Sequence, residues 1–388
     1  MGPKGFMYAI SISAVTISSC KKPYTPTITA SNVNYLVVEG VINAGQDSTI
    51  IKLSRTVNIA GNINAVAELG AHVAIESNHN ISYPLQETGN GNYTSSALNL
   101  DITQKYHLRI TTSAGKEYLS DFESTKPNPP IDSVGFIVQD NGIQLHVNTH
   151  DSNNNTRYYR WEYKETWQFN AKYAAQFITD GTKLNYRLAP QQIYGCFGNN
   201  ASSDILLGST ASLSKDIIYQ QPVTQIASNS EKLERKYSIL IKQYALTSNA
   251  YSFWQNLKKN SEQLGTIFAP LPSEAAGNIH YITTPSEPVI GYVSVTNIQQ
   301  KRIFISNSQL PRTWVPDYPY QCELDSMFIH RHGQNDVALF LIPIGSKEFA
   351  IATLADPGSG TFLGYLSANA ECADCTIRGT TKQPDFWR

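Results

Sequence analysis

Two cysteines near the end of the chain have a spacing that could do chemistry. Cys372 and Cys375 form a Cys-x-x-Cys pair, which could be a redox couple or half of a metal site. A thioredoxin-like pair should open a helix that follows a strand, whereas this pair lies among polar residues. Of the five cysteines, Cys20 is expected to carry a lipid, so this pair, Cys196 and Cys322 are the four that remain, and an even number in an exported protein favours two disulfides. Four cysteines allow three pairings, which the sequence cannot separate.

A zinc site is the competing interpretation of these cysteines. His330 and His332 alternate along a strand-like stretch, so both would lie on one face and could join the cysteines as ligands. Export and the even cysteine count favour the structural disulfides, and we therefore expect neither a metal site nor a cofactor.

Catalytic motifs are weak elsewhere in the chain. Ser212 and Lys215 have the Ser-x-x-Lys spacing of an acyl-transfer enzyme, but so short a pattern arises by chance in a Ser-rich chain, and its usual companion motifs are missing from the sequence. The sequence contains no His-Glu-x-x-His motif, phosphate-binding loop or dinucleotide fingerprint. Paired carboxylates for glycoside cleavage leave no spacing in a sequence, so that chemistry stays open. We expect no catalytic residues.

The first 19 residues have the order of a secretory signal. Lys4 supplies a basic start, an apolar-leaning stretch follows, and Ser18 and Ser19 are small residues before a cut. The apolar stretch is shorter than the roughly 20 residues that span a bilayer. Cys20 directly after it resembles the lipidated cysteine of bacterial lipoproteins. The sequence therefore predicts a signal peptide over 1–19, acylation of Cys20 and a Pro- and Thr-containing tether over 20–34.

Composition favours sheets and disfavours a nucleic-acid partner. The formal net charge of the 388 residues is −1, and 16% of them are charged, without a basic run that could follow phosphates. The 22 tyrosines, with many Asn, Ser and Thr residues between short apolar segments, suit β-strands.

Short alternating segments indicate a first β-sandwich over 35–126. Residues 106–111 place apolar side chains on one face and polar ones on the other, which is the period of a half-buried strand. A turn at 113–115 and a returning segment at 117–119 complete a hairpin. About seven such strands make a β-sandwich plausible. The pairing of Gly91-Asn92-Tyr93 with Tyr106-x-Leu108-x-Ile110 and Gly115-x-x-Tyr118 resembles a transthyretin-like sandwich, which is a likeness of fold and implies no activity.

Proline-rich residues 126–130 indicate a linker, and a second β-sandwich is expected over 131–306. Its most informative strand is 157–169, where Tyr159, Trp161, Tyr163, Trp167 and Phe169 share one face. This row could be a stacking platform for sugar rings or the inward face of a central strand. The opposite face is polar, which favours the core interpretation and makes Trp161 a packing residue.

Within the second sandwich, a helix and an irregular segment are expected to form an insertion over 249–288. Ser248 and Asn249 could cap the helix, and Ala250, Phe253 and Leu257 repeat at helical spacing. The irregular segment at 277–280 needs support from side chains. Residues 289–295 and 302–305 should then pair as a hairpin of the second sandwich. The remaining 307–388 should pack on that domain, pinned by disulfides.

Several segments together resemble a family of Bacteroidetes outer-membrane lipoproteins catalogued as domain of unknown function 4249. They are Leu36-Val37-Val38-Glu39-Gly40, Leu53-Ser54-Arg55-Thr56, Tyr251-x-x-Trp254-x-x-Leu257, Gly277-Asn278-Ile279, Gly291-Tyr292-Val293, Cys372-Ala373-Asp374-Cys375 and Lys382-x-Pro384-Asp385-Phe386-Trp387. The resemblance spans nearly the whole mature chain. It implies a role beside TonB-dependent outer-membrane receptors and supplies no catalytic residues.

The expected fold is therefore mainly β, with two immunoglobulin- or transthyretin-like sandwiches in tandem, a helical insertion and a disulfide-pinned C-terminal extension. The expected function is that of a non-catalytic accessory protein, lipid-anchored in the outer membrane, that binds a ligand of unknown identity or a receptor. Lys21 and Lys22 follow the anchor where surface-displayed relatives tend to be acidic, so the side of the membrane stays undecided. The alternative is an exported hydrolase with a site between the second sandwich and the 249–288 insertion.

Overall fold

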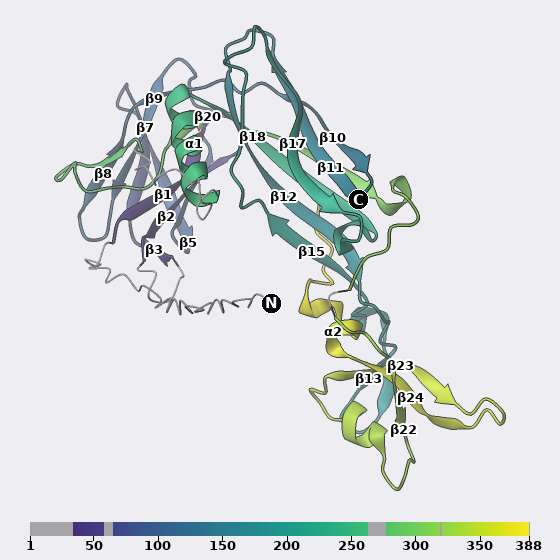
Figure 1. Ribbon diagram of the computed structural model, residues 1–388. Coiled ribbons are helices and arrows are strands. Elements are labelled where there is room, and N and C mark those ends of the chain that lie inside the picture. Colours follow the sequence, from purple (N-terminus) through teal and green to yellow (C-terminus); the bar gives the residue numbers. More distant parts are fainter. Residues whose placement is uncertain (1–33, 58–64, 263–276, 319, 388) are drawn as a thin grey trace, which may run out of the picture.

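The computed structural model describes residues 34–57, 65–262, 277–318 and 320–387. The signal peptide, Cys20 and nearly all of the tether lie outside these residues. The described chain is mainly β and is arranged in three parts (Figure 1). None of its helices is long and apolar enough to cross a membrane.

The first part is a curled sheet, which has eleven strands in the residues described. Its central path runs β19-β8-β7-β4-β5-β6-β2-β1-β20, with β3 and β9 beside it. The strands are β1 (Leu36–Asn43), β2 (Ser48–Arg55), β3 (Val66–Ala67), β4 (His72–Ser77), β5 (Ser82–Gly89), β6 (Asn92–Ala97), β7 (Lys105–Thr111), β8 (Glu117–Ser120), β9 (Glu123–Ser124), β19 (Ile279–Tyr281) and β20 (Ser294–Thr296). The alternation predicted for 106–111 is present, since Tyr106, Leu108 and Ile110 are buried in the core of this sheet.

The second part consists of a three-stranded sheet, β10-β11-β17, and a larger sheet, β15-β12-β18-β21, with β16 paired to β12. The strands are β10 (Ile131–Gln139), β11 (Gly142–Asp151), β12 (Tyr158–Asn170), β15 (Gly195–Ala201), β16 (Leu206–Ser209), β17 (Asp216–Ala227), β18 (Lys236–Leu246) and β21 (Gln299–Ser306). Both sheets contribute side chains to one apolar core.

Tyr159, Trp161 and Tyr163 of the aromatic row of β12 are buried in this core, and Trp167 packs against it, whereas Phe169 is buried in a neighbouring cluster. Trp161 is 1% exposed, its ring stacks on Tyr159 with centroids 5.7 Å apart, and its Nε1 donates to Oε1 of Gln243 over 2.9 Å. The core interpretation of Trp161 is therefore confirmed. The same face also carries Glu165, which is 1% exposed, accepts from the Tyr237 hydroxyl and is ion-paired with Lys232.

Residues 289–295 were predicted to pair with 302–305, and this is wrong. β20 runs parallel to β1 of the first sheet, whereas β21 pairs with β18 of the second. β19, which lies within the insertion predicted over 249–288, pairs with β8 of the first sheet. After α1 (Ser248–Glu262) the chain thus returns to the first sheet, where β19 and β20 pair with β8 and β1.

Local features explain this return. Gly291 has φ +145° and lies so close to β1 that a Cβ atom there would be 2.2 Å from the Val38 carbonyl oxygen. The Asn278 side chain, which is 3% exposed, accepts from the Val293 amide and donates to the Val293 carbonyl, both over 2.9 Å. The irregular segment therefore has the side-chain support that its sequence required.

The third part is small and was not expected. Its sheet has the order β22-β24-β23, and a hairpin of β13 and β14 lies beside it. The strands are β13 (Phe177–Thr179), β14 (Leu184–Tyr186), β22 (Asp325–Phe328), β23 (Glu348–Ala355) and β24 (Phe362–Asn369). The middle of the C-terminal extension thus forms a sheet with a core of its own. The two ends of the extension pack on the second part, as expected: Leu310 is buried in its core and Thr380 bridges to Phe197.

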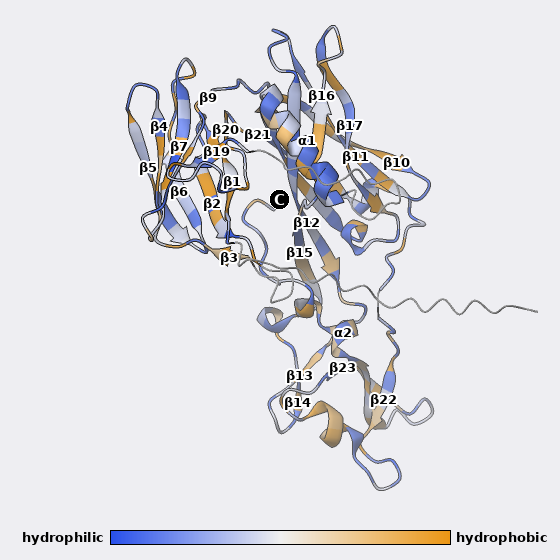
Figure 2. Cartoon of the chain, turned by 60° about the vertical axis from the view of Figure 1, so that its left-hand side comes forward, coloured by the Kyte–Doolittle hydropathy of each residue, from blue (hydrophilic) through white to orange (hydrophobic). Residues whose placement is uncertain are grey.

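The short helical turns lie mainly at the borders of these parts. They are η1 (Ala189–Gln191), η2 (Glu231–Leu233), η3 (Asn307–Gln309), η4 (Val337–Leu341), α2 (Ala370–Ala373) and η5 (Cys375–Ile377). Figure 2 shows the three parts from another side, with α1 again between the first part and the second.

Candidate functional site

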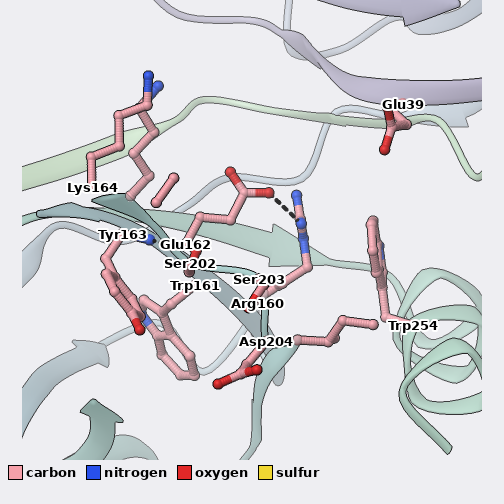
Figure 3. Close-up of a pocket in the computed structure, with 13 residues that line it drawn as sticks. Glu39, Arg160, Trp161, Glu162, Tyr163, Lys164, Ser202, Ser203, Asp204 and Trp254 are labelled. Carbon is pink, nitrogen blue, oxygen red and sulfur yellow. Dashed lines mark hydrogen bonds and ion pairs between the residues drawn. The ribbon is translucent and has the colours of Figure 1, made fainter. Parts of the chain in front are cut away.

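A groove lies where the first part, the second part and α1 meet. The groove consists of three adjoining cavities, which we number in this order: about 250, 260 and 250 Å³. Each has both Glu39 and Trp254 in its wall. Glu39 comes from β1 and Trp254 from α1, while β12 and β18 form the floor of two of the cavities. We call this the Trp254 groove; Figure 3 shows its largest group of charged side chains.

The helix that carries Trp254 is fixed by its cap and by its apolar stripe. Thr247, and not the predicted Ser248 or Asn249, accepts a hydrogen bond from the Ala250 amide over 3.2 Å through its Oγ1. Ala250 and Phe253 are buried in a cluster that also contains Val41 of β1 and Tyr244 of β18. This shared apolar cluster joins α1 to both sheets and holds the groove open above it.

Arg160 is the central cation of the groove floor. It projects from the polar face of β12, yet it is only 7% exposed because Trp254 and Tyr244 cover it. Its guanidinium carbon lies 4.1 Å from the centre of the Trp254 ring and 4.5 Å from that of Tyr244. The polar face of β12 is therefore also partly buried, which corrects the expectation that only the aromatic face could be.

Glu162 balances Arg160. Nη1 of Arg160 donates to Oε1 of Glu162, and the Tyr244 hydroxyl donates to Oε2 over 2.8 Å. Burial alone would raise the pKa of Glu162, but the charge of Arg160 and these hydrogen bonds outweigh it and hold the pKa below its ordinary value. Glu162 is therefore a permanently charged partner at neutral pH.

Other charged side chains of the groove are uncommitted. Lys164, Lys242 and Asp204 line the first cavity, and among the described residues none of them forms an ion pair. Glu39 has only an exposed contact, over 3.2 Å, with Lys52. These charges are available to a ligand.

The third cavity is apolar. Phe253, Leu257, Ile290 and Tyr292 line it beside Trp254. The rings of Phe253 and Tyr292 lie 5.5 Å apart, and the Tyr292 hydroxyl donates to Glu123 over 2.5 Å, which fixes the ring in the wall. The groove thus has a charged half and an apolar half, with Trp254 between them.

The predicted cysteines lie far from this groove in the fold. Cys196 is bonded to Cys375, and Cys322 is bonded to Cys372. The prediction of two disulfides is confirmed, and the interpretation of Cys372 with Cys375 as a redox couple is wrong. The disulfides tie the C-terminal segment to β15 and to the chain that enters the third part.

The remaining candidates form no site in the structure. In the part of the chain described, no group of three or more His, Cys, Asp or Glu residues could hold a metal ion, and His330 and His332 lie at a turn. Ser212 and Lys215 are exposed in a turn before β17. Cys20 lies outside the described residues.

Sequence reasoning missed Arg160, Glu162 and Lys242 as site residues. Their types and alternation were visible, but they look like an ordinary solvated face. The sequence signal that could have found them is the helix at 248–262, since its wide apolar stripe needs a surface to cover.

Comparison with known proteins assigns the chain to a family, but that family has no known function. The family model described as domain of unknown function (DUF4249) matches residues 21–302, which include every residue of the Trp254 groove. No curated protein matches the chain.

Proposed function

The chain belongs to the family of domain of unknown function 4249, and from that premise we propose that it is a non-catalytic binding protein, lipid-anchored in the outer membrane through Cys20, which uses the Trp254 groove to hold a ligand or receptor segment. Its partner is a TonB-dependent receptor, and its role is accessory to uptake or surface recognition.

The observation that carries this proposal is the convergence of distant segments on one groove. Glu39, Arg160 and Trp254 are far apart in sequence, yet all three line the two charged cavities. Binding sites commonly form where domains meet, with a few polar groups beside apolar ones. Buried Arg160 and the uncommitted Lys242 are such polar groups.

A hydrolase is the second candidate, because the groove lies where that alternative required it, between the second part and α1. Glu39, Glu162 and Asp204 supply three carboxylates to the first cavity. Glycoside cleavage needs one carboxylic acid with a raised pKa. The pKa of Glu162 is lowered, so this residue suits the role of a fixed anion better than that of a proton donor.

Anchoring is tested by fractionation. The Cys20→Ala variant should leave the membrane fraction and appear in the soluble fraction, because it lacks the acylated thiol. Fractionation like that of the wild type would contradict the anchor.

The binding role is tested by co-purification from native membranes. Trp254→Ala should lose a co-purifying TonB-dependent receptor, whereas Trp314→Ala, a partly buried tryptophan of the second core, should retain it. Equal recovery with both variants would contradict the use of the groove. Turnover of oligosaccharides that disappears with Glu162→Gln would support the hydrolase instead.

A further inference from the structure

We propose that the Trp254 groove selects an acidic peptide segment: an apolar side chain enters the apolar cavity, and a neighbouring carboxylate is held by Lys242 and Lys164. This inference rests on the proposed function, since it names the ligand class of the same groove.

The apolar half fits one side chain. Its cavity of about 250 Å³ is bounded by Phe253, Leu257 and Ile290, with the Trp254 ring at the border of the charged half. A leucine or phenylalanine side chain would remove this wall from water. Glu39 is the one charged side chain in this wall, so an apolar side chain is the group that the rest of the wall matches.

The charged half offers cations to an anion. Glu162 lies directly opposite Lys242 in the β12–β18 register, and Lys164 lies opposite Leu240, so both lysines share one face as diagonal neighbours. Figure 3 shows Lys164 and Glu162 on the same side of the strand. Arg160 and the Tyr244 hydroxyl engage both carboxylate oxygens of Glu162, so this acid forms no ion pair with either lysine, although the charge of Lys242 also helps to lower its pKa.

The other charges agree with an acidic ligand. Glu39 lines all three cavities but is paired with Lys52 over 3.2 Å, and Asp204 lines only the first cavity, whereas Lys242 lines two. Arg160 adds a further donor, since its buried Nε has no hydrogen-bond partner among the described residues. Because Glu162 is bound by Arg160 and Glu39 by Lys52, the two lysines and the Nε of Arg160 still have donors to offer a carboxylate.

Peptide backbone suits the remaining wall. Ser202 and Ser203 follow β15 and line the first cavity; the Ser202 hydroxyl accepts from the Tyr163 amide over 3.0 Å, and Ser203 is exposed. An extended peptide presents amide and carbonyl groups to such hydroxyls while it places successive side chains in different directions.

The test is titration calorimetry on the unlipidated full chain, Cys20→Ala, with two end-capped hexapeptides. One carries two leucines and two aspartates, and its twin has asparagine in place of aspartate. The acidic peptide should bind at least about tenfold more tightly than the twin, and this preference should shrink as salt rises.

Variants assign the preference to the groove. Lys242→Gln should abolish the difference between the two peptides, and Leu257→Asn should weaken both. Lys183→Gln, an exposed lysine of the third part, is the matched control and should change neither affinity. Retention of the preference in Lys242→Gln would overturn the assignment of the carboxylate to this lysine.

Two further outcomes separate the ligand class from the proposed function. Equal binding of both peptides, or binding of a maltohexaose probe instead, would overturn the acidic-peptide inference while leaving a working groove. If no probe binds but Trp254→Ala still loses the receptor, the inference fails and the proposed function stands. If Trp254→Ala also keeps the receptor, both fail.

Discussion

Replacing Trp161 by alanine should strongly destabilise the second part of the molecule without unfolding it at ordinary temperatures. The ring is 1% exposed, stacks on Tyr159 and lies against Gly208, where a Cβ atom would be 2.7 Å from the ring. Truncation of a buried aromatic costs about 3–5 kcal/mol. It also strands Oε1 of Gln243, a buried acceptor whose loss of a partner costs about 1–3 kcal/mol.

A loss of about 5 kcal/mol is a large share of the 5–15 kcal/mol that stabilises a domain. It should lower the melting temperature of the second part by roughly 10–20 °C. Trp161→Phe separates the two contributions, because it keeps most of the ring packing and removes the hydrogen bond. That variant should lose about 1–3 kcal/mol.

The three parts need not unfold together, so the assay should resolve them. Hydrogen exchange followed by mass spectrometry on a urea series reports β12 and β18 separately from the first sheet. In Trp161→Ala, peptides of β12 and β18 should lose protection at lower urea than peptides of β2 and β7. Trp254→Ala is the matched control, since its ring is partly exposed and its removal should leave that protection nearly unchanged.

Unchanged protection of β12 in Trp161→Ala, together with lost ligand binding, would refute the reasoning. The aromatic row would then be a binding platform, and the core interpretation would be wrong despite the burial of the ring.

Two other perturbations have signs that follow from the structure. Cys196→Ser removes the disulfide to Cys375, which closes a loop of sequence separation 179, and should cost up to about 5 kcal/mol of stability by the chain-entropy relation. The last 14 residues should then lose protection from hydrogen exchange at lower urea. Full protection there would contradict this expectation. The pKa of Glu123 is raised above its ordinary value of 4.5, mainly by burial, so the folded state binds the proton more tightly and stability should fall as pH rises above about 4.5. Glu123→Gln should flatten that part of the pH profile in urea midpoints, and an unchanged slope would count against this residue.

Alternation in the sequence was enough to predict the class of fold and the inward face of β12. Side-chain period is a local property, so Tyr159 and Trp161 indicate their face without knowledge of their neighbours. The even number of cysteines likewise predicted two disulfides, because disulfide formation depends on the compartment and on the number of cysteines. Their pairing depends on three-dimensional proximity and stayed open.

Strand partners could not be predicted in the same way. From their sequence, residues 289–295 could pair with β1 or with β21, since both strands contain apolar residues. β21 lies close in sequence, which favoured it. The structure pairs β20 with β1, which is about 250 residues away in the chain; a contact of such separation carries no local signal. The third part was missed for the same reason, because β13 and β23 contact each other although they are about 170 residues apart in the sequence.

The candidate groove was invisible because its key residues are ordinary one at a time. Arg160 alternates with aromatic residues and reads as a solvated side chain. Its burial depends on Trp254, which arrives on a helix more than 90 positions later. The site forms only where these two elements meet, and the sequence of neither element predicts that contact.

The same reasoning predicts that the groove depends on residues outside it. The linker was read as a stiff spacer, yet Asn128 is 5% exposed and its amide group donates to the carbonyls of Gln243 and Asn297, over 2.6 and 2.9 Å. It thus ties the strand under the groove to the chain that joins β20 to β21. Asn128→Ala should let the two parts move relative to each other and weaken peptide binding, with no change in any residue of the groove wall. Asn153→Ala, an exposed asparagine before β12, is the control, and equal affinities of the two variants would mean that the apolar cluster around Phe253 alone fixes the groove.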